Sequence, residues 1–177
     1  MIGGAVCDSS CCFFPEGKED IITPVGTRKV IEYLMREALS ESEKSRNTGE
    51  VPVGCIITDG SGTIIGRGHN APVASTDPTA HGEMIALRDA AKKQGNYRLP
   101  GSLAFVTLEP CPMCAGALVH ARVARVYFGA KDPKGGGLVS NYGIGTDGKL
   151  NHEIEVVGGV LEEECQRLLK EFFRGKR

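Results

Sequence analysis

Two cysteines and a histidine–glutamate pair are the residues of this chain whose types and spacing could carry out chemistry. Cys111 and Cys114 are three residues apart, and a helix opening at Pro112 would hold both sulfurs near its N-terminus. The helix dipole and the free N–H groups at that position favour thiolates. On its own, a C-x-x-C pair fits a redox dithiol, half of a four-cysteine structural zinc site, or two ligands of a catalytic zinc ion.

His81 and Glu83 lie where another helix is expected to begin, and they separate these alternatives. One imidazole and two thiolates supply three zinc ligands and leave a fourth position for water, as in catalytic zinc sites. Glu83 would remain unbound and could move protons between that water and a substrate. A redox dithiol would leave His81 and Glu83 without a role, and a non-catalytic zinc-binding subunit has no need of Glu83. The sequence has no second C-x-x-C pair to complete a structural site.

The elements that must position these residues follow from the spacing of apolar side chains. Periods of three and four predict helices over about residues 27–45, 81–94, 112–121 and 161–173. Short apolar runs predict strands over about residues 53–58, 63–68, 103–108, 123–129 and 154–157. Loops rich in Pro, Ser, Thr and Asn (70–80) and in Gly (131–150) separate them. The alternation predicts an α/β domain of three layers, α-β-α, with helices on both faces of a mixed five-stranded sheet.

Composition limits the class of protein. The 177 residues are 41% hydrophobic and 24% charged, which suits one globular domain, and no apolar run reaches the roughly 18 residues of a membrane span. We therefore expect no membrane partner. The formal net charge of −1 argues against a protein that holds nucleic acid by bulk electrostatics alone, but it leaves a local basic patch open.

The cysteines and the first residues indicate compartment and domain limits. Seven cysteines are an odd number, and no secretory signal pattern opens the chain, so we expect a reducing cytoplasm rather than a disulfide framework. Residues 1–24 carry four acids against one lysine and include Cys7, Cys11 and Cys12. We interpret residues 1–24 as an acidic flexible leader and residues 25–177 as the folded domain. Cys55 and Cys165 sit in apolar patterns and are expected to be buried.

The chemistry-bearing residues also match a known signature. An H-x-E triplet followed by P-C-x-x-C marks the zinc-dependent nucleobase deaminases, and this chain has His81-Gly82-Glu83 and Pro110-Cys111-Pro112-Met113-Cys114. From about residue 27 onward the sequence resembles the bacterial tRNA-specific adenosine deaminases, a group of the cytidine and deoxycytidylate deaminase-like enzymes. The similar segments are Glu50-Val51-Pro52-Val53-Gly54, Pro78-Thr79-Ala80-His81, Val106 to Ala117, Asp132-Pro133-Lys134-Gly135-Gly136, Leu150-Asn151-His152, and Gly159 to Cys165 with Phe172-Phe173.

The resemblance implies a fold, a reaction and a set of site residues. The fold would be the cytidine-deaminase-like domain, and the protein would convert the wobble adenosine of a tRNA anticodon to inosine as a homodimer. His81, Cys111 and Cys114 would bind one zinc ion per chain, and Glu83 would be the catalytic proton carrier.

The same resemblance implies contacts with the RNA. Asn70 matches a residue that touches the target base, and Asp132 lies in the loop that approaches the substrate. Phe172 and Phe173, on a final helix with a basic end, match the part that meets the anticodon loop. Residues 170–177 carry four basic side chains against one acid, and an aromatic pair beside positive charge suits an unstacked RNA loop.

The chain departs from the family pattern at two places. Gly82 replaces the usual alanine, which removes only a methyl group. After Gly136 the family has Gly-Ser-Leu, a large residue and Asn or Asp, whereas this chain has the stretch 137–143 and matches only at the serine, Ser140. This loop keeps open an alternative function, the deamination of a free nucleobase or nucleoside of the guanine, cytosine or adenosine type.

Overall fold

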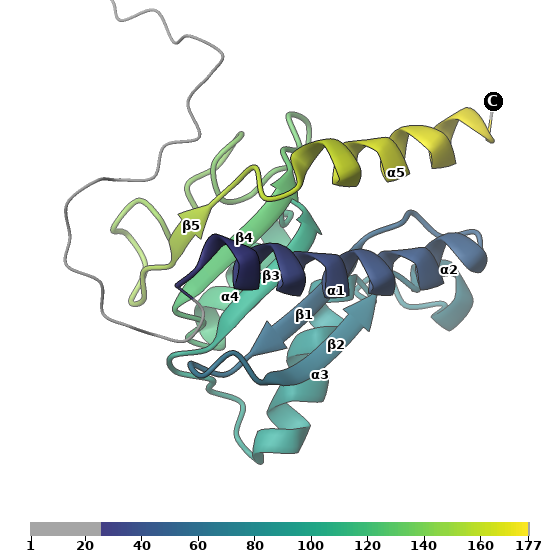
Figure 1. Ribbon diagram of the computed structural model, residues 1–177. Helices are drawn as coiled ribbons and strands as arrows, with labels where there is room; N and C mark the ends of the chain where they lie inside the picture. The colour runs from purple at the N-terminus through teal and green to yellow at the C-terminus, as the bar shows by residue number, and fades with distance from the viewer. Residues whose placement is uncertain (1–25, 177) are drawn as a thin grey trace, which may run out of the picture.

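One mixed sheet of five strands organises the part of the chain that the computed structural model describes, residues 26–176 (Figure 1). In spatial order the strands are β2 (Ile64–His69), β1 (Gly54–Thr58), β3 (Leu103–Leu108), β4 (Arg125–Ala130) and β5 (Glu155–Val157). β1 is antiparallel to both of its neighbours, while β3, β4 and β5 are mutually parallel. The predicted mixed five-stranded sheet is confirmed. The expected leader, residues 1–24, lies outside the described residues.

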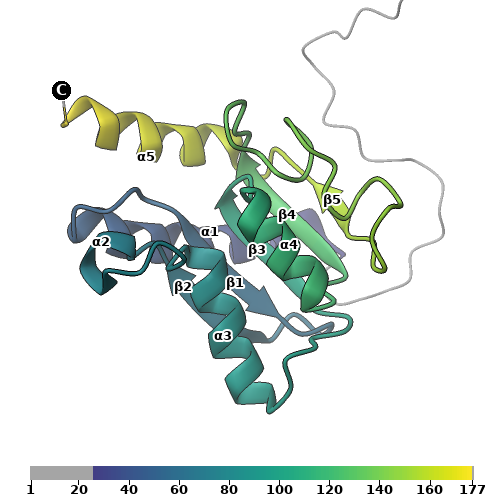
Figure 2. The same ribbon diagram turned by 180° about the vertical axis from the view of Figure 1, so that it is seen from behind.

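Helices cover both faces of this sheet, as the three-layer prediction requires. α1 (Arg28–Asn47) and α5 (Glu162–Arg174) lie on one face, and α3 (Gly82–Gln94) and α4 (Pro112–His120) lie on the other (Figures 1 and 2). The expected bounds of these four helices hold to within two residues. A short helix, α2 (Pro72–Ser75), occupies part of the segment expected to be a loop, because Pro72 opens a turn that ends at the left-handed residue Thr76.

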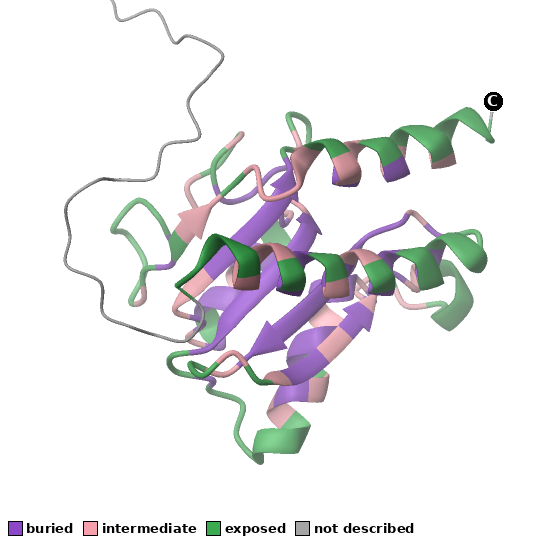
Figure 3. Cartoon of the chain, in the orientation of Figure 1, coloured by how far each residue is buried: buried purple, intermediate pink, exposed green. Residues whose placement is uncertain are grey.

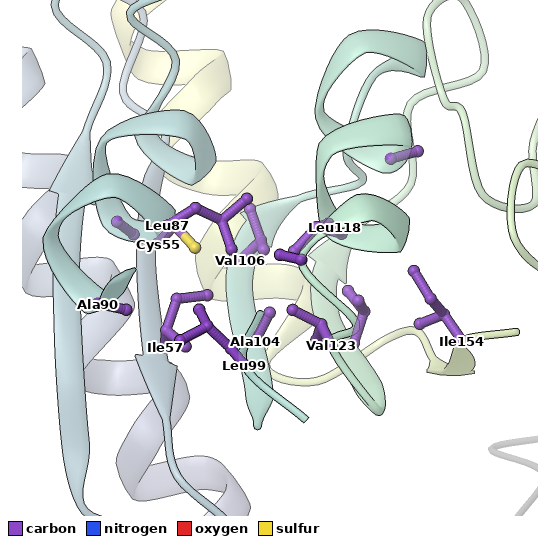
Figure 4. Packing of buried hydrophobic residues seen from close by; sticks show 14 of the residues in the cluster. Cys55, Ile57, Leu87, Ala90, Leu99, Ala104, Val106, Leu118, Val123 and Ile154 are labelled. Atoms are coloured by element: carbon purple, nitrogen blue, oxygen red, sulfur yellow. The ribbon is translucent and has the colours of Figure 1, made fainter. Parts of the chain in front are cut away.

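The alternation of side chains along each strand divides the core into two halves. In β1, Cys55 and Ile57 join the cluster under α3 and α4, whereas Ile56 joins the cluster under α1 and α5. All five residues of β1 are buried, which explains why apolar and polar residues do not alternate along its sequence (Figure 3). Figure 4 shows Cys55 and Ile57 packed in the first of these clusters. Cys55 and Cys165 are 0% and 1% exposed, so their expected burial is confirmed.

Two glycines in β2 bring α3 against the sheet. A Cβ atom at Gly66 would lie 2.3 Å from the carbonyl oxygen of Ala86, and one at Gly68 would lie 2.2 Å from that of Gly82. Only glycine permits such an approach of helix backbone to strand backbone. The first turn of α3 is therefore pressed onto the end of β2, which determines where its N-terminus lies.

The strand directions gather two helix starts at one edge of the sheet. Because β1 is antiparallel to both β2 and β3, these two strands point the same way, and β4 is parallel to β3. α3 follows β2 and α4 follows β3, so both helices begin at the carboxyl edge of the sheet. Helix N-termini carry free N–H groups, and an edge where two of them meet suits a site that handles anions or thiolates.

Candidate functional site

His81 stands at the N-cap position of α3, but another residue makes the capping hydrogen bond. It is the N-cap residue, with an extended backbone (φ −74°, ψ 153°), yet its side chain makes no capping hydrogen bond. Asn70, at the end of β2, supplies the cap instead, since its Oδ1 accepts the N–H of Gly82 at 2.8 Å. The imidazole is thereby free to face another element, while Glu83 projects from inside the first helical turn. This explains how residues two apart in a helical region serve one site.

Cys111 and Cys114 meet that imidazole from the start of α4. Cys111 is the N-cap residue of α4, Pro112 follows it, and Cys114 lies buried in the first turn. The Nδ1 atom of His81 lies 3.6 Å from the sulfur of Cys111 and 3.6 Å from the sulfur of Cys114. All three donor atoms lie within 4.8 Å of one another.

The separation of these donor atoms fits zinc. A tetrahedral ion with bonds of roughly 2.05 Å to nitrogen and 2.3 Å to sulfur holds such a pair of atoms about 3.6 Å apart, which matches the spacing in this protein. One nitrogen and two sulfurs are also a donor set that zinc prefers over harder cations. The site thus fits zinc, and three protein ligands leave room for one further ligand.

The electrostatics of the cluster favour a thiolate and a proton-carrying carboxyl group. A hydrogen bond from the Cys114 thiol, supported by the facing His81, lowers the pKa of Cys111 to about 4. Burial raises the pKa of Glu83 to about 7. Glu83 is 3% exposed, and within residues 26–176 its Oε2 has no hydrogen-bond partner. A carboxyl group with a pKa near neutrality and a free oxygen can both accept and release a proton.

The structure places Asn70 beside this cluster and Asp132 on a loop that packs against it. Asn70 is 8% exposed, and its Oδ1 is used by Gly82; in the described part of the chain its Nδ2 is paired with no protein acceptor. Asp132 follows β4, and its Oδ1 accepts the N–H groups of Lys134 and Gly135, both at 3.0 Å. Asp132 therefore shapes its own loop, and Asn70 retains a free donor.

Phe172 and Phe173 lie at a distance along the fold, at the C-terminal end of α5. Their rings form an edge-to-face pair with centroids 5.4 Å apart, and the Lys176 ammonium lies 4.9 Å from the Phe172 centroid. Lys176 also donates to the carbonyl of Gly49 at 3.0 Å, which ties this helix end to the segment after α1. Phe173 is 51% exposed while Phe172 is half-buried. The structure does not group these rings with His81 and the cysteines.

Sequence reasoning missed two buried carboxylates that hold the loops around the site. Glu109, between β3 and Cys111, accepts hydrogen bonds from the loop after β4. Glu50 accepts the N–H groups of Val73 and Ala74 at 2.9 and 2.8 Å, and so caps α2. For Glu109 a signal was available, because an acid directly follows a mostly apolar, buried strand. For Glu50 the segment it caps was not itself predicted to be helical.

Comparison with known proteins gives consistent matches over most of the chain. The family described as the cytidine and deoxycytidylate deaminase zinc-binding region matches residues 28–130. A Haemophilus influenzae protein named tRNA-specific adenosine deaminase is 49% identical over 146 residues, which is 82% of this chain and 84% of that protein.

Solved structures show the same relationship. One from a study of A-to-I editing by tRNA:A34 deaminases at the wobble position is 38% identical, with a TM-score of 0.74, and the match covers 77% of this chain and 99% of that one. A guanine deaminase from Bacillus subtilis is 37% identical with a TM-score of 0.53, over 56% of this chain and 64% of that one. The fold of this chain is therefore the α/β fold of the deaminases.

Proposed function

The chain belongs to the cytidine and deoxycytidylate deaminase family, and on that premise we propose that it converts the wobble adenosine of a tRNA anticodon to inosine. The reaction is a zinc-dependent hydrolysis in which water replaces the amine at C6 of adenine and ammonia leaves. One observation carries the proposal: a zinc-compatible His81–Cys111–Cys114 cluster stands beside a buried glutamate with an unpaired oxygen. The 49% identity to a protein named tRNA-specific adenosine deaminase supports the choice of substrate.

His81, Cys111 and Cys114 hold one zinc ion per chain in this proposal. When bound, zinc supplies a Lewis acid that makes water a competent nucleophile near neutral pH. The three side chains keep their positions through the elements that carry them. Asn70 fixes the start of α3, and Pro112 fixes the start of α4.

Glu83 moves the protons. Its carboxylate accepts a proton from the attacking water and passes it to the ring nitrogen of adenine. It then accepts the second proton from the new hydroxyl group at C6 and gives it to the departing amine, which leaves as ammonia. The group must change its protonation state in both directions near neutral pH, and burial raises its pKa to about 7. Its unpaired Oε2 is the atom at which the proton is held.

The remaining proposed contacts bind the RNA. The free Nδ2 of Asn70 donates to an acceptor on the target base. The Asp132 loop approaches the nucleotide, and the exposed ring of Phe173, with Phe172 behind it, stacks on an unpaired base of the anticodon loop. These contacts let a chain with a net charge of −1 recognise one RNA loop without a broad basic surface.

The assembly and location follow the family expectation. We propose that two copies form a homodimer, that residues 25–177 make up the deaminase domain, and that the protein acts in the cytoplasm. No helix within residues 26–176 combines the length and the apolar character needed to cross a membrane. Sedimentation of the purified protein tests the dimer.

A free nucleobase or nucleoside remains the second candidate substrate. Two observations favour it: the loop of residues 137–143 departs from the pattern of the tRNA-acting enzymes, and a guanine deaminase is 37% identical over 56% of this chain. The zinc ligands and Glu83 serve either substrate, since both reactions replace an exocyclic amine.

A substrate panel distinguishes the two candidates. The purified protein is incubated with an anticodon stem-loop carrying a wobble adenosine, and separately with adenine, guanine, cytosine and their nucleosides. We expect inosine in the RNA and no ammonia from the free compounds. Ammonia from a free base with unchanged RNA would overturn the main proposal and establish the second.

A further inference from the structure

Glu109 is a buried carboxylate that the reaction described above does not use. It is 2% exposed, and its backbone N–H donates to the carbonyl of Ala130 at 2.8 Å, which extends the pairing of β3 with β4. Two residues later the chain reaches Cys111. Glu109 therefore stands at the junction of the sheet edge, the start of α4 and the loop that follows β4.

All of the carboxylate's hydrogen bonds come from that loop. Its Oε1 accepts the N–H of Val139 at 2.9 Å and that of Ser140 at 2.8 Å. Its Oε2 accepts the N–H of Asp132 at 3.2 Å and the hydroxyl of Ser140. Both ends of the segment 132–140 are thus attached to one side chain, Glu109.

No Lys, Arg or His forms an ion pair with Glu109 among residues 26–176. The four hydrogen bonds from the loop therefore satisfy the buried carboxylate, and the carboxylate in turn orders the loop. The two cannot separate without leaving buried polar groups unsatisfied.

The loop is also packed tightly against Pro110 and the proposed zinc ligand Cys111. A Cβ atom at Gly136 would lie 2.5 Å from the carboxylate of Glu109. One at Gly137 would lie 2.8 Å from the carbonyl carbon of Cys111, and the N–H of Gly137 donates to the carbonyl of Pro110 at 2.7 Å. The loop after β4 lies at the same end of the molecule as the N-terminus of α4 (Figure 2).

From this arrangement we infer that Glu109 is a positioning residue. It fixes the 132–140 loop, which includes Asp132, against the segment around Cys111 at the start of α4, so that the loop is already ordered before the substrate binds. That this loop meets the RNA rests on the proposed function. Glu109 itself touches neither substrate nor zinc in this account. Its contribution is to substrate binding, because preordering the loop removes part of the entropy lost when RNA binds. Ser140, the residue of the altered stretch that keeps the family pattern, contributes the hydroxyl.

Two variants and one matched control test this role. Glu109→Gln replaces one acceptor oxygen by an amide group facing Asp132, and Ser140→Ala removes only the hydroxyl bond. Glu41→Gln makes the same chemical change at another buried carboxylate, which lies on α1 and pairs with Lys44 and Arg67. All three proteins are prepared loaded with zinc, and zinc content is measured before each assay.

The first measurement is amide hydrogen exchange without RNA. In Glu109→Gln we expect exchange of the Asp132, Val139 and Ser140 amides to accelerate about fivefold or more, the factor that one net hydrogen bond supplies, while Glu41→Gln leaves them unchanged. Unchanged exchange in Glu109→Gln overturns the inference whatever the substrate is. This readout is independent of the proposed function.

The second measurement separates KM from kcat on the wobble-adenosine stem-loop. We expect KM to rise about fivefold or more in Glu109→Gln, and by less in Ser140→Ala, with kcat within about twofold of wild type and zinc retained. A fall in kcat at constant KM, or loss of zinc, would assign Glu109 to the metal site instead and contradict the inference. If wild-type protein leaves the stem-loop unchanged, the proposed function fails, and the exchange result still decides the anchoring role.

Discussion

Asn70 has two roles, as the cap of α3 and as the proposed donor to the target base, and a single substitution separates them. Its Oδ1 caps α3 through the 2.8 Å bond from Gly82, while its Nδ2 is left for the target base. Asn70→Asp keeps the capping oxygen and even places a negative charge at a helix N-terminus, but it replaces the donor by an acceptor. Asn70→Ala removes both groups. The two variants should therefore differ in stability and agree in lost substrate recognition.

The magnitudes follow from the bonds concerned. Loss of a helix cap lowers the free energy of unfolding by about 1 kcal/mol, so Asn70→Ala should be destabilised by about that amount and Asn70→Asp should not. An acceptor on the bound base that loses its donor weakens transition-state binding by about 1–3 kcal/mol. We therefore expect kcat/KM on the wobble-adenosine stem-loop to fall about 5- to 150-fold in both variants.

The assay combines urea unfolding, zinc content and steady-state kinetics. Asn96→Asp is the matched control, because the Oδ1 of Asn96 likewise accepts a backbone N–H, that of Arg98 at 3.0 Å, at the opposite end of α3. It should leave kcat/KM unchanged. If Asn70→Asp keeps zinc and shows wild-type kcat/KM, Asn70 is only a helix cap and the base contact is refuted.

Three further predictions concern the metal, acid stability and RNA binding. Cys111→Ser should lower bound zinc from one ion per chain to a small fraction, and full retention would show that this sulfur is not a ligand. Burial raises the pKa of Glu41, but bonds from its cationic neighbours outweigh it and lower the pKa. Ionised Glu41 therefore stabilises the folded protein above about pH 4.5, and this stabilisation is lost as pH falls through the lowered pKa. The difference in unfolding free energy between wild type and Glu41→Gln should shrink from pH 6 to pH 3; a constant difference would contradict the pairing. Phe173→Ala should raise KM for the stem-loop about 5- to 150-fold through lost stacking. Tyr97→Ala, at an exposed aromatic beyond the C-terminal end of α3, should not; equal effects would remove Phe173 from the RNA surface.

The parts of the fold that could be predicted are those set by local pattern. The apolar run of β1 and the three- and four-residue spacing along α1 and α3 depend only on neighbouring residues, so these elements were placed to within two residues. α2 was missed because its four residues give no periodicity. Its start is fixed by Glu50, more than twenty residues away in sequence.

The residue types of the site could be predicted, but the hydrogen bonds that position them could not. His81, Glu83 and the cysteines were found because zinc chemistry restricts both residue type and spacing. The capping of α3 by Asn70 and the attachment of the 132–140 loop to Glu109 could not be found in this way. Each depends on side-chain oxygens meeting N–H groups 12 to 31 residues away, and such partners are set by tertiary packing rather than by a local motif.

The most direct test of the central claim is the appearance of inosine at one position of one RNA. Wild-type protein and Glu83→Gln, both loaded with zinc, are incubated with a full-length tRNA that carries adenosine at the wobble position, and the RNA is sequenced for inosine. We predict inosine at that position with wild type, a rate lower by about 100-fold or more with Glu83→Gln, and equal zinc in the two proteins. Unmodified RNA with the zinc-loaded wild type, or undiminished inosine with Glu83→Gln, would contradict it.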